Sequence, residues 1–370
     1  MGLNKNDVKK LAAIGRRIHS RLKSYGLYTK SSAPETMLEE NKISYGEGYP
    51  IIGIEKFLGY YDANYNIAYS PSISITTDFS KCKAFCAYSK TGRDEVLLDG
   101  VSSEKYSKRM EKALSIFKKE NGIKGSFKFY ITRDKRYADA KGLGESAAIA
   151  SASSEALVRC TFGNDAIRDR KLVSRYARLV SGSGTRSASG VISMWLSYPG
   201  IKSGECYAEQ MDIKHNKIHL FTLPERSTVE TIGAHEAAKR SDFYREWLFG
   251  KYERFSDNTR LNHINSLLSL AEKDTLRLDA VLLSGGMFVH NDKSLYRIKK
   301  YMEFKESNKD VYMSADTGPS LVFISENMKS LRTLEKSLDG NALYGNVPEN
   351  RISNPKAADL RLAQNFLLAV

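Results

Sequence analysis

The sequence has few cysteine, histidine and tryptophan residues: four, six and two among 370. The four cysteines have neither the spacing of a zinc site nor that of a disulfide framework, which argues against a small secreted domain. No apolar run is long enough to cross a bilayer, and the charged N-terminal residues are not followed by the apolar core of a signal peptide. We therefore expect a globular, cytoplasmic protein without a membrane-spanning segment.

Acidic residues are the minority charge, with 43 Asp and Glu against 57 Lys and Arg, a net charge of +14. The basic residues are spread along the chain, with a mild concentration in residues 5–23, where helical spacing of apolar residues predicts an amphipathic helix. No familiar nucleic-acid-binding motif accompanies them. The charge is consistent with a small anionic substrate, and we expect neither nucleic acid nor a membrane as a partner.

The alternation of apolar patterns predicts an α+β protein of two lobes behind a leading helix. We expect an N-terminal helical extension at 1–42, a first lobe at 43–222 and a second lobe at 223–370. The first lobe should hold strands at 51–54, 72–77, 127–132 and 217–221, and helices at 102–121, 145–162 and 164–180. The second should hold helices at 234–249, 260–273 and 292–305, strands at 311–313 and 320–324, and a last helix from Glu326.

A glycine-bearing turn between a predicted strand and a predicted helix has the context of a phosphate loop. Its residues are Gly142, Leu143, Gly144, Glu145, Ser146 and Ala147. A carboxylate about 4 Å from a phosphate costs on the order of 4 kcal/mol at an effective dielectric near 20, against roughly 0.3–1 kcal/mol gained from the helix dipole. Either Glu145 caps its own helix and faces solvent, or the loop is unsuited to ATP.

Two further segments have the residue types of a binding site. Ser181–Gly190 is dense in hydroxyls and glycines around Arg186, whose guanidinium can hold a carboxylate or phosphate through two hydrogen bonds, so a binding loop is favoured over a linker. Asp316 begins a Gly-Pro turn between two predicted strands, which is ordinary turn chemistry unless a partner such as Lys56 lies beside it.

His235 and Glu236 begin a sequence similar to the helical zinc motif of metalloproteases, but the second histidine is missing at the required spacing. The other five histidines are scattered along the chain. We expect no metal site.

Taken in order, six segments resemble the GHMP kinase superfamily and, within it, the diphosphomevalonate decarboxylase family. They are Lys56–Gly59, Ser70–Thr76, Gly142–Ala148, Ser181–Ser187, Phe243–Trp247 and Asp316–Pro319. The resemblance extends from about residue 45 to the C-terminus. It implies a ribosomal-protein-like N-terminal lobe, a ferredoxin-like C-terminal lobe, and a homodimer.

The resemblance also implies roles at C3 of the substrate. The residue matched by Arg186 holds the C1 carboxylate, and those matched by Asp316 and Lys56 act at the C3 oxygen. Three positions depart from the family: Glu145 replaces a serine, Tyr60 replaces a lysine, and Glu230–Thr231 replaces the Ser-Arg pair that holds the 5-diphosphate. Both ATP use and diphosphate recognition are therefore in question.

These departures are similar to the archaeal relatives that act on (R)-mevalonate 3,5-bisphosphate, which need no ATP or other cofactor and release isopentenyl phosphate, CO2 and phosphate. The substrate-binding residues so implied, or adjacent in sequence to the lost pair, are Tyr60, Ser181, Gly182, Ser183, Thr185, His235, Lys239 and Arg240. Alternatives are an ATP- and magnesium-dependent decarboxylase of the 5-diphosphate or 5-phosphate, a mevalonate 3-kinase-like enzyme, and a non-catalytic basic binding protein.

Overall fold

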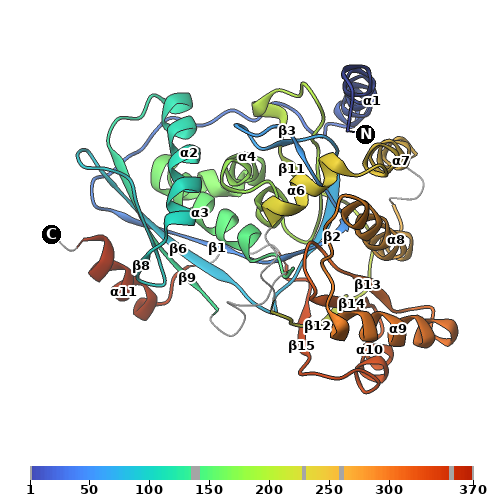
Figure 1. Cartoon of the computed structure of the whole chain (residues 1–370). Coiled ribbons are helices and arrows are strands. Elements are labelled where there is room, and N and C mark those ends of the chain that lie inside the picture. Colours follow the sequence, from blue (N-terminus) through green and yellow to red (C-terminus); the bar gives the residue numbers. More distant parts are fainter. Residues whose placement is uncertain (1, 135–141, 227–230, 258–261, 350–353, 369–370) are drawn as a thin grey trace.

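The computed structural model describes residues 2–134, 142–226, 231–257, 262–349 and 354–368. Helices and sheets are mixed, as the sequence predicts, and they form the two-lobed arrangement seen in Figure 1. The described helices do not include one that is long and apolar enough to cross a membrane.

The first lobe is built on two sheets. The larger has the order β1 (Ile43–Gly48), β6 (Cys82–Ser89), β9 (Ser126–Arg133), β7 (Glu95–Leu98) and β8 (Val101–Ser102). The smaller has the order β11 (Ala208–Gln210), β10 (Ile192–Trp195), β5 (Ser72–Thr76) and β2 (Ile51–Glu55), and a short pair, β3 (Tyr60–Asp62) and β4 (Ile67–Ala68), lies apart. The helices are α2 (Glu104–Asn121), α3 (Glu145–Phe162), α4 (Arg170–Val180) and α5 (Gly184–Ser189).

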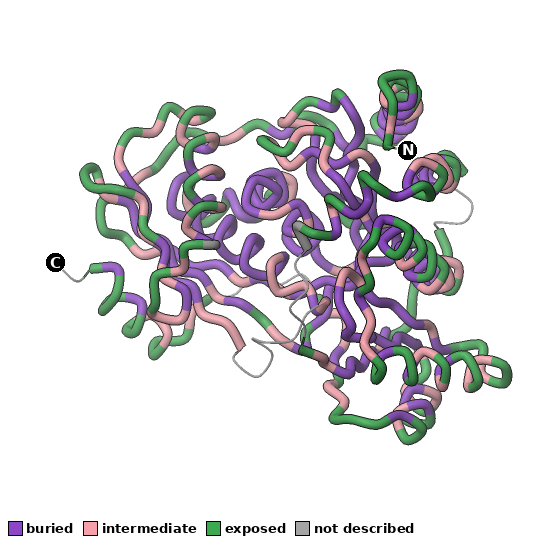
Figure 2. The backbone as a smooth tube through the Cα atoms, in the orientation of Figure 1, coloured by how far each residue is buried: buried purple, intermediate pink, exposed green. Residues whose placement is uncertain are grey.

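Helix α3 is the centre of this lobe and is buried from Ala147 to its end (Figure 2). Its Ala- and Ser-rich sequence lets it lie close to β1, where two glycines leave room for it. A β-carbon on Gly46 would stand 2.3 Å from the Ala152 carbonyl oxygen, and one on Gly48 would stand 2.0 Å from that of Ala148. The close approach fixes the N-terminus of α3 at the end of the cavity described below.

The second lobe contains one antiparallel sheet of order β13 (Tyr312–Ser314), β14 (Leu321–Ser325), β12 (His219–Leu223) and β15 (Leu343–Asn346). With α8 (Ile264–Ser284), α9 (Asp292–Ser307) and α10 (Met328–Glu335), it has the ferredoxin-like order that the resemblance implies. Because β12 begins at His219, this lobe starts before the predicted boundary at residue 222.

The two ends of the chain pack on the body at different places. Helix α1 (Lys5–Ser24) buries Leu11, Ile18 and Leu22 in the main core and contacts α7 (Tyr244–Ser256). Helix α11 (Ala357–Leu367) packs on β6 and β9 of the first lobe, at the opposite side of Figure 1 from the rest of the second lobe. The predicted second lobe, 223–370, therefore includes a helix that covers the first.

An apolar cluster joins α11 to the first lobe, beside an ion pair of 2.6 Å between Lys83 of β6 and Asp359. Its Ala363 and Leu367 join Tyr45, Phe85 and Tyr130 in one cluster, and the rings of Tyr130 and Phe366 stack at 4.6 Å.

Two predicted helices are interrupted. The 234–249 prediction was wrong, because α6 (Thr231–Arg240) ends where Ser241 Oγ accepts the Phe243 N–H, and α7 begins after it. The 164–180 prediction was wrong at its start: Asn164–Arg168 is a 3-10 helix, and Asp169 caps α4 by accepting from the backbone of Lys171 and Leu172. Other described elements, among them β1, β6, β10, β15 and α11, were not predicted.

Candidate active site

A cavity of about 360 Å³ is lined by residues of both lobes. This volume lies within the range of small-molecule sites. The charged residues of its lining are Lys56, Arg109, Lys112, Arg186, Glu145 and Asp316, and the ring-bearing ones are Phe57, Tyr60, Tyr106 and His235. Four cations against two carboxylates favour an anionic ligand.

Asp316 follows β13 and lies directly against β2. A β-carbon on Gly53 would stand 2.7 Å from Asp316 Oδ1, so the absence of a side chain there makes room for the carboxylate. Burial raises the pKa of Asp316, although the charges of Lys56 and Arg186 oppose the increase. Asp316 is thus held beside two cations. Its role is therefore not limited to capping the backbone of the turn.

Lys56 follows β2 and is 3% exposed. Its Nζ donates to the Thr275 hydroxyl at 2.9 Å, the Gly53 carbonyl at 3.1 Å and the Ser314 hydroxyl at 3.2 Å, all of them uncharged. Burial lowers its pKa, and the charges of Asp316 and Asp274 act in the opposite direction. The ammonium is therefore fixed in place without neutralisation by a directly bonded carboxylate among the described residues.

Arg186 lies in α5 and is 3% exposed. Its Nε and Nη1 are buried and have no hydrogen-bond partner among the described residues, while its guanidinium lies 5.3 Å from the centre of the Phe57 ring. Burial lowers its pKa to about 10, with Asp316 and Tyr60 acting in the opposite direction. Unpaired donors of a buried cation, facing a cavity, are suited to a carboxylate ligand.

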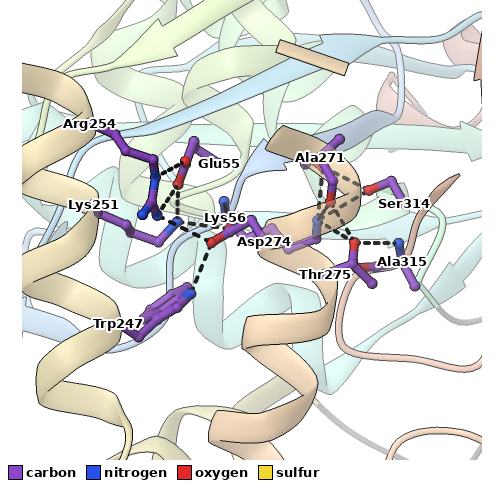
Figure 3. A network of polar contacts seen from close by, with 11 residues as sticks. Glu55, Lys56, Trp247, Lys251, Arg254, Ala271, Asp274, Thr275, Ser314 and Ala315 are labelled. Atoms are coloured by element: carbon purple, nitrogen blue, oxygen red, sulfur yellow. Dashed lines mark hydrogen bonds and ion pairs between the residues drawn. The ribbon is translucent and has the colours of Figure 1, made fainter. Parts of the chain in front are cut away.

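A buried ion network supports the backbone at Lys56 (Figure 3). Asp274 of α8 accepts the Lys56 backbone N–H at 2.7 Å and the Trp247 indole N–H at 2.9 Å. Lys251 donates to Asp274 at 2.8 Å and to Glu55 at 2.6 Å, and all three side chains of these ion pairs are fully buried. These residues position Lys56 and do not line the cavity.

Sequence reasoning missed most of this network. Trp247 lies in the Phe243–Trp247 segment that resembles the family, whereas Lys251 and Asp274 lie just beyond the ends of the predicted helices 234–249 and 260–273, with no local pattern that marks them. The signal that was available is spacing, because Trp247 and Lys251 are four residues apart and share one face of a helix.

Glu145 lines the cavity at the first turn of α3 and does not simply face solvent. Both its oxygens lie 3.4 Å from Arg133 Nη1, and Arg133 Nε also pairs with Asp99 at 2.8 Å. Gly144 before it has φ = +73° and would clash with the Ile51 backbone if it carried a β-carbon. The glycine turn into the helix is therefore present, and the first residue of that helix carries a carboxylate.

The predicted loop residues divide into two groups. Gly142, Leu143, Gly144, Glu145 and Ser146 line the cavity, whereas Ala147 is buried in the core. From the serine-rich loop, Ser181, Ser183 and Arg186 line it. Thr185 is fully buried and donates to the Gly182 carbonyl at 2.7 Å, so these two residues shape the loop and do not line the cavity.

His235 and Tyr60 lie together in the lining, with ring centres 4.9 Å apart. His235 Nδ1 accepts the Gly59 N–H at 2.9 Å, and burial lowers its pKa to about 4, so the imidazole is neutral near pH 7. Burial raises the pKa of Tyr60 to about 12.

Lys239 and Arg240 are both exposed and lie outside this lining: Lys239 pairs with Glu236, and Arg240 donates to the Gly285 carbonyl. Glu230 and the side chain of Thr231 lie outside the described residues.

The α2 residues that line the cavity were also not predicted from the sequence. Tyr106, Arg109 and Lys112 are three residues apart in turn and face the cavity from one side of the helix. That periodicity was visible, but a basic helix face is most often simply solvated. No group of metal-ligating side chains occurs in the described part of the chain.

Comparison with known proteins identifies the family of this chain. Residues 48–208 match the diphosphomevalonate decarboxylase-like N-terminal domain. The chain is 42% identical over 365 residues to the mevalonate 3,5-bisphosphate decarboxylase of Thermoplasma acidophilum, covering 97% of this chain and 89% of that protein. It is 41% identical over 351 residues to the enzyme of the same name from Thermoplasma volcanium, covering 94% of each.

Solved structures share the fold at lower identity. Mevalonate diphosphate decarboxylase from Staphylococcus aureus has a TM-score of 0.70 at 20% identity and covers 84% of this chain and 97% of its own. Mevalonate-3-kinase from Thermoplasma acidophilum has a TM-score of 0.66 at 16% identity, covering 83% and 96%. The chain therefore belongs to the diphosphomevalonate decarboxylase-like family of the GHMP superfamily, in the group of the mevalonate 3,5-bisphosphate decarboxylases.

Proposed function

We propose that this protein is a carboxy-lyase that converts (R)-mevalonate 3,5-bisphosphate to isopentenyl phosphate, CO2 and phosphate without ATP. The observation that carries the proposal is the buried, unpaired Arg186 beside Asp316 and Lys56 in one anion-favouring cavity. The two Thermoplasma relatives, whose names state this substrate, support it.

The three residues have complementary roles in the reaction. Arg186 binds the C1 carboxylate through its unpaired N–H groups, which orients C1. The C3–O bond breaks with its electron pair leaving on the phosphate, whose charge Lys56 stabilises, while the carboxylate of Asp316 stabilises the positive charge that builds on C3. The C1–C2 bond then breaks, its electron pair forms the C2–C3 double bond, and C1 leaves as CO2.

Independence from ATP is supported by Glu145. Its carboxylate stands at the helix N-terminus, where a nucleotide would need to place phosphate, and it is paired with Arg133 at 3.4 Å. A substrate that already carries its 3-phosphate needs no phosphoryl donor. We expect the Glu145→Ser variant to bind ATP with magnesium at least about tenfold more tightly than the wild type, as measured by isothermal titration.

The deciding experiment is incubation of the purified protein with mevalonate 3,5-bisphosphate in the absence of nucleotide, followed by measurement of CO2 and inorganic phosphate. We expect both products in equal amounts, and release about 10²- to 10³-fold slower from an Asp316→Asn control. No release there, together with turnover of the 5-diphosphate that requires ATP and magnesium, would overturn the proposal.

The proposed setting is a cytoplasmic homodimer. The four cysteines are free thiols, which is in keeping with a reducing compartment. Large apolar side chains are exposed on α8 and α9, including Leu283 at 60% and Met302 at 45%, and would suit a subunit contact. Light scattering of the purified protein tests the dimer.

A further inference from the structure

Two parts of the cavity carry positive charge. Lys56 and Arg186 stand with Asp316 at one part, which the proposed reaction fills with C1, C3 and the 3-phosphate. Arg109 and Lys112 line the other from α2. The proposed reaction as derived above uses neither of them.

Arg109 is available to a ligand. In the described part of the chain its guanidinium has no hydrogen bond or ion pair, and it lies 5.8 Å from the centre of the ring of Tyr106, which also lines the cavity. Lys112 is less free, since its Nζ donates to the Ala63 carbonyl. Arg109 is therefore the stronger candidate for an anion ligand.

Tyr60 and His235 connect the two parts of the cavity. The positive charges of Arg109 and Arg186 both oppose the increase that burial causes in the pKa of Tyr60, and all three residues line the cavity. Burial, and to a smaller extent the charges of Lys239 and Arg109, lower the pKa of His235. Arg109 is thus near enough to the Tyr60–His235 ring pair to affect the pKa of both, whereas the cations that affect Asp316 are Lys56 and Arg186.

We infer that Arg109, with Lys112 at the rim, binds the 5-phosphate of the substrate. A chain held by its carboxylate on Arg186 and by C3 at Asp316 extends past Tyr60, and its second phosphate requires a cation beyond it. A phosphomonoester carries roughly 1.5 to 2 negative charges at neutral pH, and a guanidinium binds it through two hydrogen bonds. This inference rests on the proposed function, because it takes the substrate from there.

A 5-phosphate site at Arg109 does not require Lys239 or Arg240. Both of these residues lie outside the cavity lining. The 5-phosphate is then recognised by the first lobe through α2. Because α2 offers one guanidinium and one rim lysine, the site fits a single phosphate better than a diphosphate.

The test compares Arg109→Gln with the wild type on mevalonate 3,5-bisphosphate and on mevalonate 3-phosphate, which lacks the second phosphate. We expect the variant to lose about 10²-fold in kcat/KM on the bisphosphate, mostly through KM, and less than about threefold on the 3-phosphate. Arg109→Lys should recover part of the loss. Lys108→Gln is the matched control, because Lys108 is on the exposed side of α2 and pairs with Glu104 at 2.6 Å.

Equal losses on both substrates, or no loss on either, would overturn the inference. Titration with mevalonate 5-phosphate gives a readout that needs no turnover: Arg109→Gln should weaken its binding at least about tenfold. If the wild type releases no CO2 from the bisphosphate but still shows this difference in binding, the proposed function fails and the phosphate site stands. If turnover is present and binding of the 5-phosphate is unchanged in the variant, the phosphate site fails alone.

Discussion

Asp316 Oδ1 occupies the space that a side chain on Gly53 would take, 2.7 Å from the position of its β-carbon. The same β-carbon would stand 2.8 Å from Lys56 Cγ. A single missing methyl group thus lets a carboxylate of the second lobe and a lysine of the first lobe share one end of the cavity.

The Gly53→Ala variant should lose most of its activity while remaining folded. The added methyl group displaces Asp316 or Lys56, and a misplacement of about 1 Å can cost on the order of 10²-fold in rate. The kcat on the bisphosphate measures the effect, with circular dichroism as a check on folding. Gly204→Ala is the control, since a β-carbon there meets nothing within 4 Å, and activity of Gly53→Ala equal to that of this control would contradict the argument.

Asp316→Asn should lower kcat by about 10²- to 10³-fold while substrate still binds. Burial raises the pKa of Asp316, so the carboxyl remains protonated to a higher pH than its ordinary value of 3.8. Activity of the wild type should therefore rise with pH through this raised pKa. The pH profile of kcat/KM shows the step, and the step should be missing from the residual activity of Asp316→Asn, whereas titration of the substrate phosphates would remain in both.

Arg186→Met should abolish turnover and increase stability. A pKa lowered from 12.5 to about 10 corresponds to on the order of 3 kcal/mol against the charged, buried guanidinium at neutral pH. This pKa already includes the attraction to Asp316, so we expect a gain of about 1–3 kcal/mol in the free energy of unfolding. Urea denaturation measures it. A variant less stable than the wild type would show that Arg186 is satisfied in the unliganded protein.

Asp274→Asn should destabilise the protein by about 3–5 kcal/mol, because it leaves Lys251 with one carboxylate in a fully buried network. Burial alone would raise the pKa of Asp274, but Lys251 and Lys56 lower it below 3.8. Its contribution to stability is therefore fully present above about pH 4 and is lost as the pH falls through the lowered pKa. Denaturation of both proteins from pH 3 to pH 7 measures the difference.

The exposed Glu253→Gln, on the same helix as Lys251, is the control for this variant and should change stability by less than about 0.5 kcal/mol. Activity should also fall in Asp274→Asn, since the Lys56 backbone loses its acceptor. A variant as stable as the control would mean that the network is not a source of stability.

Local patterns predicted much of the fold. Helix α3 was predicted at its observed bounds, because it has no glycine or proline and follows two glycines. The interruption at Ser241 was missed because a single hydroxyl bonded to a backbone N–H ended the helix within an unbroken helical pattern. Strand β6 was missed because both of its faces are covered, which removes the alternation that marks a strand.

The site residues that lie in short segments of distinctive composition were predictable from the sequence. Arg186 and Asp316 stand in short segments whose composition is unusual, and the order of those segments resembled one family. Arg109 was missed because nothing next to it in the sequence distinguishes a cavity-facing arginine from a solvated one. Its position depends on how α2 lies against the rest of the lobe, which is a tertiary property.

The position of helix α11 affects the order in which the first lobe is completed during synthesis. The sheet face it covers includes Phe85 and Tyr130, which leave the ribosome long before residue 367 does. During that interval the nascent first lobe has an apolar face without its cover, a surface that holdase chaperones recognise and that favours aggregation. Completion of the first lobe is therefore among the last steps of synthesis, although its sequence comes first.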